Sequence, residues 1–225
     1  MKIQSGDVLA FDVYGTLIDI HALTPALSML VGSKAAQLSQ IWRQKQLEYA
    51  FRRGLMGAFV PFSTVTGQAL DYALKVTGEN ISADERDNLL ERYRTLDAFI
   101  DARPAMQALS ADGVECHAFS NGDPEDIESL LRSQGLWGAM HGAVSVLPAQ
   151  TFKPAPAAYE HFCKTVDAKA DRCWIVSSNP FDVMGAMNAG WRSIWVQRNP
   201  EDVFDPWGVE PTLTIQSLSD LPEYL

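Results

Sequence analysis

The chain of 225 residues carries a formal net charge of −10 and has no basic run, which argues against nucleic acid and anionic membranes as partners. Its apolar share of 47% is enough to bury one large domain, or a core with a second small one. The odd number of cysteines, without metal-ligand spacing, favours reduced thiols and a cytoplasmic protein. Asp7 and Asp12 interrupt the first apolar run, so we expect no signal peptide and no membrane-spanning segment.

The first predicted element is a buried parallel strand that ends at Asp12, where four apolar residues lead into the acid and a turn follows at once. Open α/β sheets bind ligands at this end of their strands. Gly15 lets the chain bend and brings backbone N–H groups towards an anion. Thr16 is close enough in sequence to hydrogen-bond the Asp12 carboxylate. Asp12 is therefore a candidate nucleophile, and the alternatives are a helix N-cap or a structural aspartate.

A largely helical region follows, up to about residue 96. Residues 38–51 are helix-forming and contain no breaker, and we expect Gly54 and Gly57 to end this helix. A second helix is predicted over 62–76 and closed by Gly78. The capping-box pattern at 82–85 predicts the start of a third.

From residue 101 onward, helices and strands alternate. Helices are predicted over 104–112, 124–133, 157–166, 183–189 and 218–225, and strands over 114–119, 143–146, 173–176 and 193–196. The segment 197–210 is expected to be the longest loop. This alternation predicts an α/β fold with a doubly wound parallel sheet.

Polar side chains follow the predicted strands at their carboxyl ends. After Asp12 the chain presents Ser120 and Asn121, then Lys153, then Ser177, Asn179 and Asp182. Taken singly, the serines can be helix caps, the lysine a solvated charge and Asn179 a turn residue. Because the carboxyl ends of parallel strands share one edge, these residues together predict one active site.

The motifs FDVYGTL at 11–17, SNG at 120–122, KP at 153–154 and SSNPFD at 177–182 resemble those of the haloacid dehalogenase (HAD) superfamily. The segment WRQKQLEY at 42–49 is similar to the cap-domain signature of the L-2-haloacid dehalogenases. The resemblance covers nearly the whole chain in order. It implies a Rossmann-like core of residues 1–17 and 98–225, with a helical cap domain of residues 18–97 inserted and the substrate bound between them.

The resemblance also bears on whether the protein binds a metal ion. Most relatives in the superfamily are magnesium-dependent phosphatases or phosphotransferases with a second acid two residues after the nucleophile, a position that is Tyr14 here. Ser178 replaces their metal-binding acid near the fourth strand. Because Mg²⁺ prefers carboxylate and phosphate oxygens, we expect no metal and no cofactor. A halide leaves as a stable anion without a proton, so a dehalogenase tolerates the loss of this general acid.

The reaction implied by the resemblance is that of an (S)-2-haloacid dehalogenase. Asp12 would attack C2 of a short L-2-haloalkanoic acid, expel halide and form an ester. Water would hydrolyse this ester at the Asp12 carbonyl carbon and give a D-2-hydroxy acid. Thr16 would orient the nucleophile and Lys153 would keep it charged. The group expected to position and activate the water comprises Asp182, Ser177, Asn179 and Lys153.

The resemblance further implies how substrate is bound. Its carboxylate would lie on Ser120 and on backbone N–H groups of the first turn. A halide cradle would comprise Arg43, Asn121 and Phe181, since N–H donors and an aromatic edge attract an anion. The expected pocket walls are Tyr14, Gln44, Leu47, Phe62 and Tyr159. The implied partner is a small-molecule 2-haloacid, and the resemblance allows a homodimer.

Two other functions fit parts of the sequence. A magnesium-dependent phosphatase of a small metabolite would use the same fold, but Tyr14 stands where it needs an acid. A catalytically inactive interaction module would have no reason to keep Asp12, Arg43, Lys153 and Asp182 together.

Overall fold

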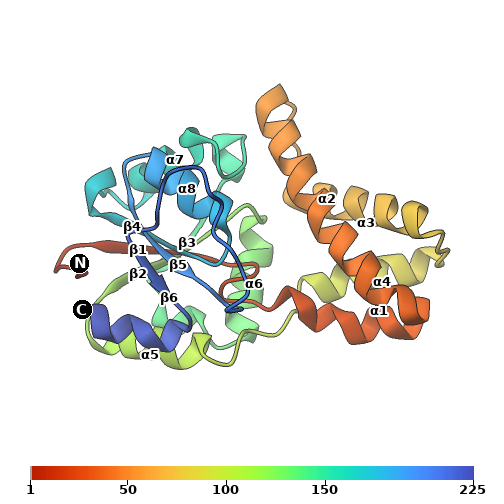
Figure 1. The fold of residues 1–225 in the computed structure, drawn as a ribbon, viewed down its shortest axis with the longest axis horizontal. Helices are drawn as coiled ribbons and strands as arrows, with labels where there is room; N and C mark the ends of the chain where they lie inside the picture. The colour runs from red at the N-terminus through yellow and green to blue at the C-terminus, as the bar shows by residue number, and fades with distance from the viewer. Residues whose placement is uncertain (1) are drawn as a thin grey trace.

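The computed structural model describes residues 2–225 and is built around a six-stranded sheet whose neighbouring strands are all parallel (Figure 1). In chain order the strands are β1 (Val8–Asp12), β2 (Glu115–Ser120), β3 (Gly142–Ser145), β4 (Cys173–Ser177), β5 (Arg192–Val196) and β6 (Leu213–Ile215). Their spatial order is β3-β2-β1-β4-β5-β6. The chain therefore reverses its winding direction between β1 and β4, which is where such sheets bind ligands. The predicted α/β fold with a parallel sheet is confirmed.

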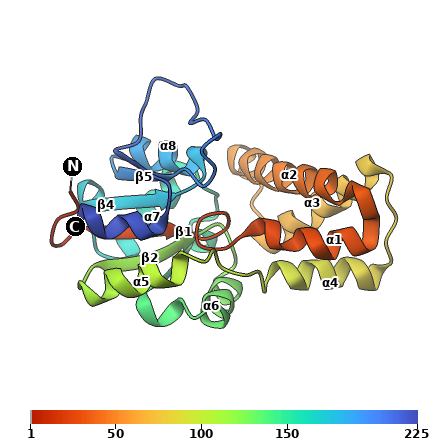
Figure 2. The same cartoon turned by 60° about the horizontal axis from the view of Figure 1, so that its bottom comes forward.

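Helices cover both faces of this sheet (Figures 1 and 2). One face carries α5 (Ala102–Ala111) and α6 (Pro124–Ser133), and the other carries α7 (Pro156–Thr165) and α8 (Pro180–Asn188). Because strand side chains alternate, β1 serves both layers. Leu9 and Phe11 pack with Met106 of α5, whereas Ala10 packs with Phe162 of α7. This central position leaves Asp12 at the edge where the two layers meet.

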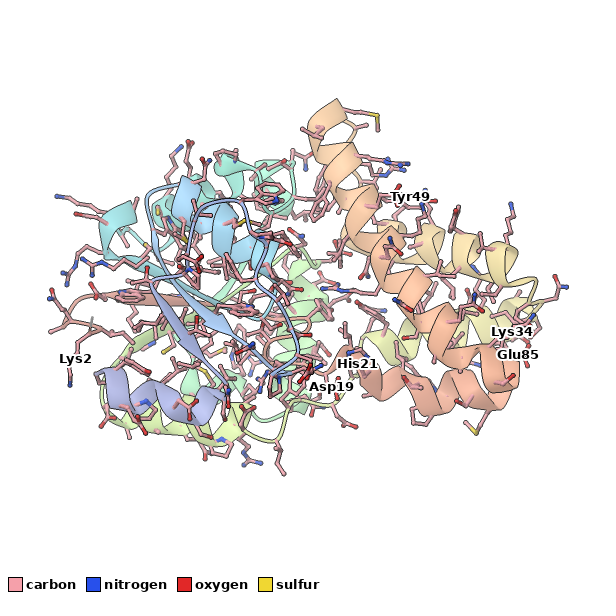
Figure 3. The ribbon with its side chains drawn as sticks, viewed as in Figure 1. Lys2, Asp19, His21, Lys34, Tyr49 and Glu85 are labelled. Carbon is pink, nitrogen blue, oxygen red and sulfur yellow. The ribbon has the colours of Figure 1, made fainter. Side chains whose placement is uncertain are left out.

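The remaining helices leave the sheet after β1 and lie together beside it (Figures 1 and 2). They are α1 (Thr24–Val31), α2 (Ala35–Met56), α3 (Phe62–Thr77) and α4 (Ala83–Tyr93). The side chains of Asp19 and His21 lie where this helical part meets the sheet part (Figure 3). The helical part is below called the cap and the sheet part the core, and the boundaries 18–97 of the cap remain a prediction.

Several predicted element ends are confirmed. Helix α6 has the predicted bounds, α3 ends at Gly78 with φ 72°, and Ser82 opens α4 with a capping box. Two ends differ. Helix α2 continues through Gly54 and stops only at Gly57, and α8 starts at Pro180 rather than at 183.

Two further features of the C-terminal part differ from the prediction. The sixth strand, β6, was not predicted, because three residues after a long loop give too short a pattern. The final segment forms a 3₁₀ helix over Leu218–Tyr224. Among the helices of residues 2–225, none combines the length and the apolarity needed to cross a membrane.

Candidate active site

Asp12 lies at the carboxyl end of β1 and is only 5% exposed. Its Oδ2 accepts hydrogen bonds from Thr16 Oγ1 at 3.0 Å, Ser177 Oγ at 3.2 Å and Asn179 Nδ2 at 2.6 Å. Its Oδ1 accepts one from Lys153 Nζ at 2.9 Å. The carboxylate is thus held by four side chains, one from the turn that follows β1 and three that the sheet edge collects from distant parts of the chain. The predicted hydrogen bond from Thr16 is confirmed.

Lys153 connects the two carboxylates of the site and is 1% exposed. Its Nζ donates to Asp12 Oδ1 at 2.9 Å, to the Phe119 carbonyl at 2.9 Å and to Asp182 Oδ2 at 2.6 Å. Burial disfavours its charge, but the two carboxylates outweigh burial and hold the pKa of Lys153 above its ordinary value. Lys153 therefore stays charged. An ammonium has three N–H donors, and because these contacts use all three, none is left for a substrate.

Asp182 lies behind Lys153 in the first turn of α8 and is fully buried. Burial raises the pKa of Asp182 to about 6, and the charge of Asp12 raises it too, while Lys153 and the Tyr159 hydroxyl oppose the rise. That hydroxyl donates to Asp182 Oδ1 at 2.8 Å. Tyr159 therefore does not line the substrate pocket, contrary to the expectation from the sequence. It is a buried partner of Asp182 instead.

The turn after β1 is locked to the end of β4. Thr16 Oγ1 accepts from the Ser178 backbone N–H at 2.9 Å, which directs the threonine hydroxyl hydrogen to Asp12. Ser178 Oγ donates to the Gly15 carbonyl at 2.7 Å. Gly15 has φ 92°, a conformation that glycine adopts without strain. Ser178 thus holds the turn that follows Asp12.

A small cavity in front of Asp12, called the inner cavity, has a free volume of about 10 Å³, enough for about one water molecule. The residues lining it were all predicted as site residues: Asp12, Tyr14, Arg43, Leu47, Phe62, Ser120, Asn121, Lys153, Asn179 and Phe181. Thr16, Ser177 and Asp182 stand behind this lining. Gln44 does not line it; its exposed side chain borders a separate cavity in the cap, which Arg43 borders as well.

Polar groups in this lining keep donors free. Asn121 Oδ1 accepts from the Lys153 backbone N–H at 2.9 Å, which leaves its NH₂ group without a partner in residues 2–225. Ser120 Oγ accepts from the Gly122 N–H at 3.0 Å and likewise keeps its hydroxyl hydrogen. The inner cavity therefore offers neutral donors to an anion on the core side.

Arg43 adds a positive charge from the cap. Its Nη2 lies 3.5 Å from the Tyr14 carbonyl and 3.4 Å from Asn179 Oδ1, and no carboxylate of residues 2–225 pairs with it. A half-buried guanidinium without an anionic partner is costly unless an anion binds it. Phe181 stands beside it, fixed by edge contact with Phe51 of the cap at 5.1 Å between ring centroids.

The donor set does not suit a magnesium ion. Asp12 and Asp182 share the Lys153 ammonium. Tyr14 and Ser178, at the two positions where the resemblance leads us to expect acids in magnesium-dependent relatives, carry no carboxylate. Within residues 2–225, no group of three or more His, Cys, Asp or Glu side chains is placed to hold a metal ion. The residues present therefore fit a site that balances charge with side chains.

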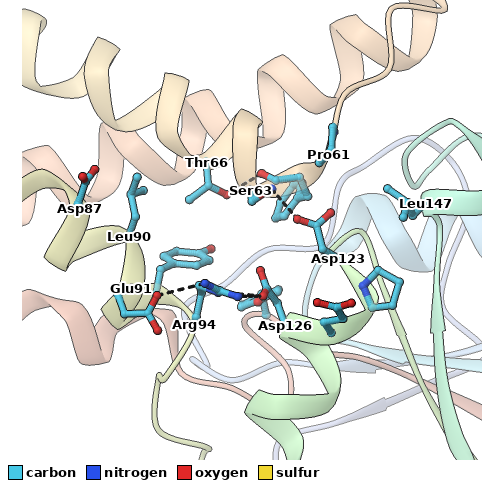
Figure 4. A pocket seen from close by; sticks show the side chains of 16 residues that line it. Pro61, Ser63, Thr66, Asp87, Leu90, Glu91, Arg94, Asp123, Asp126 and Leu147 are labelled. Atoms are coloured by element: carbon cyan, nitrogen blue, oxygen red, sulfur yellow. Dashed lines mark hydrogen bonds and ion pairs between the residues drawn. The ribbon is translucent and has the colours of Figure 1, made fainter.

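A larger cleft of about 720 Å³ lies outside the inner cavity, between α3 and α4 of the cap and α6 of the core (Figure 4). Tyr14 and Phe62 line both spaces. Arg94, the residue that follows α4, crosses this cleft, and its Nε donates to Asp126 of α6 at 2.8 Å. The Ser63 N–H donates to Asp123 at 3.3 Å. The cleft thus adjoins the inner cavity and is crossed by these two contacts between cap and core.

Gly185 is a site residue that sequence reasoning missed. A Cβ at this position of α8 would lie 2.4 Å from the Tyr159 hydroxyl oxygen and 2.5 Å from Pro154 Cβ. Only glycine lets Tyr159 pass α8 and reach Asp182. No signal in the sequence marks this, because a glycine inside a helix reads only as a weak helix former.

Comparisons with known proteins agree with this arrangement. A family model described as haloacid dehalogenase-like hydrolase matches residues 7–190. Haloacetate dehalogenase H-2 of Moraxella sp. (strain B) is 35% identical and the match covers 93% of each chain. (S)-2-haloacid dehalogenase 1 of Pseudomonas sp. (strain CBS-3) is also 35% identical, over 96% of this chain and 94% of that one.

Solved structures give the same picture. The L-2-haloacid dehalogenase of Xanthobacter autotrophicus superposes with a TM-score of 0.88 at 28% identity, over 96% of this chain and 97% of that one. The same Xanthobacter enzyme has been solved with chloropropionic acid covalently bound, and that structure matches with a TM-score of 0.88 at 27% identity.

Proposed function

The chain belongs to the haloacid dehalogenase-like hydrolases, and from this membership we propose that it is an (S)-2-haloacid dehalogenase that converts short L-2-haloalkanoic acids into D-2-hydroxy acids and halide. The observation that carries the proposal is the charge layout of the inner cavity. A carboxylate held by four donors faces a guanidinium that has no anionic partner in residues 2–225. This layout suits an attack by an anion with departure of another anion.

The first step is attack of Asp12 on C2 of the substrate. Oδ2 is held by three donors, whereas Oδ1 accepts only from Lys153 and keeps a lone pair for attack. We therefore assign Oδ1 as the nucleophilic atom. Its electron pair forms the C2–O bond while the C2–halogen pair leaves with the halide. Because attack is in line, C2 inverts once.

The halide would leave towards Arg43, the free NH₂ of Asn121 and the edge of Phe181, which all line the inner cavity. Charge develops on the halogen during this step, so donors already in place stabilise it without reorganising. The substrate carboxylate would lie on the free Ser120 hydroxyl and on backbone N–H groups of the first turn.

The second step is hydrolysis of the ester at the Asp12 carbonyl carbon. Oδ2 then is the carbonyl oxygen, and its three donors at 2.6 to 3.2 Å are placed to hold the negative charge of the tetrahedral intermediate. Asp182 is separated from Asp12 by the Lys153 ammonium, which donates to both carboxylates. We assign Asp182 as the base that takes the proton of the attacking water, while Lys153 keeps its own protons and holds the two acids in place. The tetrahedral intermediate then collapses by breaking the bond between the Asp12 carbonyl carbon and the substrate oxygen. Asp182 returns the proton to that oxygen, the D-2-hydroxy acid leaves, and the regenerated Asp12 carboxyl group ionises.

Finer features of the protein belong to the same proposal. We propose a homodimer, supported by Leu55 and Met56, which are 90% and 68% exposed at the end of α2. A cytoplasmic location is supported by the three free cysteines. A core of residues 1–17 and 98–225 with a cap of 18–97 is supported by the separate position of α1–α4 (Figure 2).

The test is halide release from L- and D-2-chloropropionate with EDTA present, beside phosphate release from p-nitrophenyl phosphate. We expect halide from the L-enantiomer alone, no effect of EDTA and no phosphate. Phosphate release that EDTA abolishes and Mg²⁺ restores would instead support the phosphatase.

A further inference from the structure

A buried amide in the cap, Gln46, contacts Arg43 but has no role in the reaction above. Gln46 lies on α2 one turn after Arg43 and is 1% exposed. Its Oε1 accepts from Arg43 Nη1 at 2.9 Å and from the Tyr93 hydroxyl at 3.0 Å. Its Nε2 donates to Thr66 Oγ1 at 2.7 Å. Every polar atom of this amide is therefore engaged inside the cap.

The network permits only one orientation of the amide. The Thr66 hydroxyl donates to the Phe62 carbonyl at 2.9 Å, so towards Gln46 it can only accept. The Arg43 guanidinium has no acceptor atom at all. A turned amide would set its NH₂ group against that guanidinium and leave buried donors unpaired, at a cost typical of lost buried hydrogen bonds. The Gln46 oxygen must therefore face Arg43.

The hydrogen bond from Arg43 to Gln46 is shorter than the contacts that the guanidinium makes with the core. Against 2.9 Å to Gln46, the contacts of Arg43 with Tyr14 and Asn179 in the core are 3.5 and 3.4 Å. The direction of the guanidinium is thus set from within the cap, and its contacts with the core are long. Because Gln46 is neutral, it holds Arg43 without cancelling the charge that an anion would use.

We infer that Gln46 is the positioning residue of Arg43, which aims the guanidinium at the departing halide in the inner cavity. The inference rests on the proposed function, in which Arg43 receives the halide. It predicts a defect that depends on the leaving group, since chloride needs more charge stabilisation during departure than bromide does. A role in cap stability alone would lower both rates equally.

The experiment measures kcat/KM, which reports the steps up to halide departure, with L-2-chloropropionate and L-2-bromopropionate. We expect Gln46→Leu to lower kcat/KM for chloride release by on the order of 10- to 100-fold, as small misplacements of catalytic groups do. The loss with the bromo-acid should be several-fold smaller. Gln37→Leu, an exposed glutamine on the same helix, is the matched control and should leave both values unchanged.

Two further variants keep the inference testable if Gln46→Leu does not fold. Gln46→Glu keeps the volume and the oxygen facing Arg43 but adds a charge that competes with the halide, so inhibition by added bromide should weaken. In an Arg43→Ala background, Gln46→Glu should have no further effect on the ratio of the two rates, because coupled residues are not additive.

Equal losses for the two halogens, or an unchanged bromide inhibition in Gln46→Glu, would overturn the inference while the wild-type activity stands. Absence of halide release from the wild-type protein would instead overturn the proposed function, so the two failures are distinguishable.

Discussion

The core half and the cap half of the active site are held in opposite ways. On the core side, Asp12, Lys153 and Asp182 are buried, and their contacts with one another are 2.9 and 2.6 Å. On the cap side, Arg43 meets the core only at 3.4 and 3.5 Å, and its short hydrogen bond stays within the cap. The surroundings of Asp12, the proposed nucleophile, are therefore complete without substrate, whereas the charge of Arg43 has no anionic partner in residues 2–225.

This difference indicates a division of tasks. In the proposed reaction, the core fixes the charge of Asp12 before substrate arrives, which preorganises the attack. The cap supplies a positive charge whose partner arrives with the substrate. The inner cavity has a free volume of only about 10 Å³, so we expect the two halves to separate when substrate enters, at contacts such as Arg94 with Asp126.

The largest expected effect concerns the nucleophile of the core half. Asp12→Asn should lower halide release by on the order of 10⁶-fold, as removal of a catalytic nucleophile does. Exposed Asp112→Asn is the matched control. Halide release by Asp12→Asn at the wild-type rate, measured from an enzyme freed of deamidated protein, would contradict the role of the core half.

The second-largest effect should follow from replacing Lys153, whose ammonium lies between the two carboxylates. Lys153→Met leaves Asp12 and Asp182 facing each other in a buried site, and we expect a loss of about 3–5 kcal/mol in the free energy of unfolding. Because Lys153 lowers the pKa of Asp182, its removal raises that pKa further, and protonation then relieves the repulsion in acid. Urea unfolding should therefore show a larger loss at about pH 8 than at about pH 5.

The control for that measurement is Lys164→Met, an exposed lysine on α7. It should change the free energy of unfolding by less than about 0.5 kcal/mol. Equal losses for the two lysine variants would mean that the buried ion pairs do not stabilise the core half.

A smaller effect should follow from Tyr159, which donates to Asp182 at 2.8 Å. Its hydrogen bond favours the ionised carboxylate, so Tyr159→Phe should raise the pKa of Asp182 above about 6. A base must be ionised, so activity falls as pH drops through this pKa. The acid limb of kcat should therefore move up by about one pH unit. The control is Tyr72→Phe, because the Tyr72 hydroxyl makes no hydrogen bond within residues 2–225. This substitution should leave the acid limb of kcat in place.

The smallest effect should come from the contact between the halves. Arg94 is half exposed, and its ion pair with Asp126 should contribute at most about 1 kcal/mol. We expect Arg94→Ala to change thermal stability little and to raise kcat modestly, because the cap then opens more easily. Arg92→Ala in the last turn of α4 is the control. A loss of several kcal/mol would show that the cap half is held as firmly as the core half.

The sequence predicted much of the core half because its signals are local. Asp12 ends an apolar run, and Thr16 follows within the same turn, so their contact depends on short-range geometry. The parallel sheet then brings Lys153, Ser177 and Asn179 to the same edge. These residues could be predicted once the strand ends were known.

The remaining features depend on how elements pack. Helix α2 ends at Gly57, which takes the left-handed conformation with φ 63°, whereas Gly54 keeps helical geometry, and the sequence alone does not show which of two nearby glycines ends a helix. Which way Tyr159 and Gln46 point depends on the helix face that each buries, and no motif reports it. The early start of α8 was readable, since Pro180 occupies the first helical position that proline favours.

The most direct test of the central claim is a single turnover of L-2-chloropropionate in ¹⁸O-labelled water with enzyme in excess. Our account predicts that the heavy oxygen enters the Asp12 carboxylate, found by mass spectrometry of the peptide containing it, and that the hydroxy acid is unlabelled. Heavy oxygen in the product and none in Asp12 would contradict attack by this carboxylate.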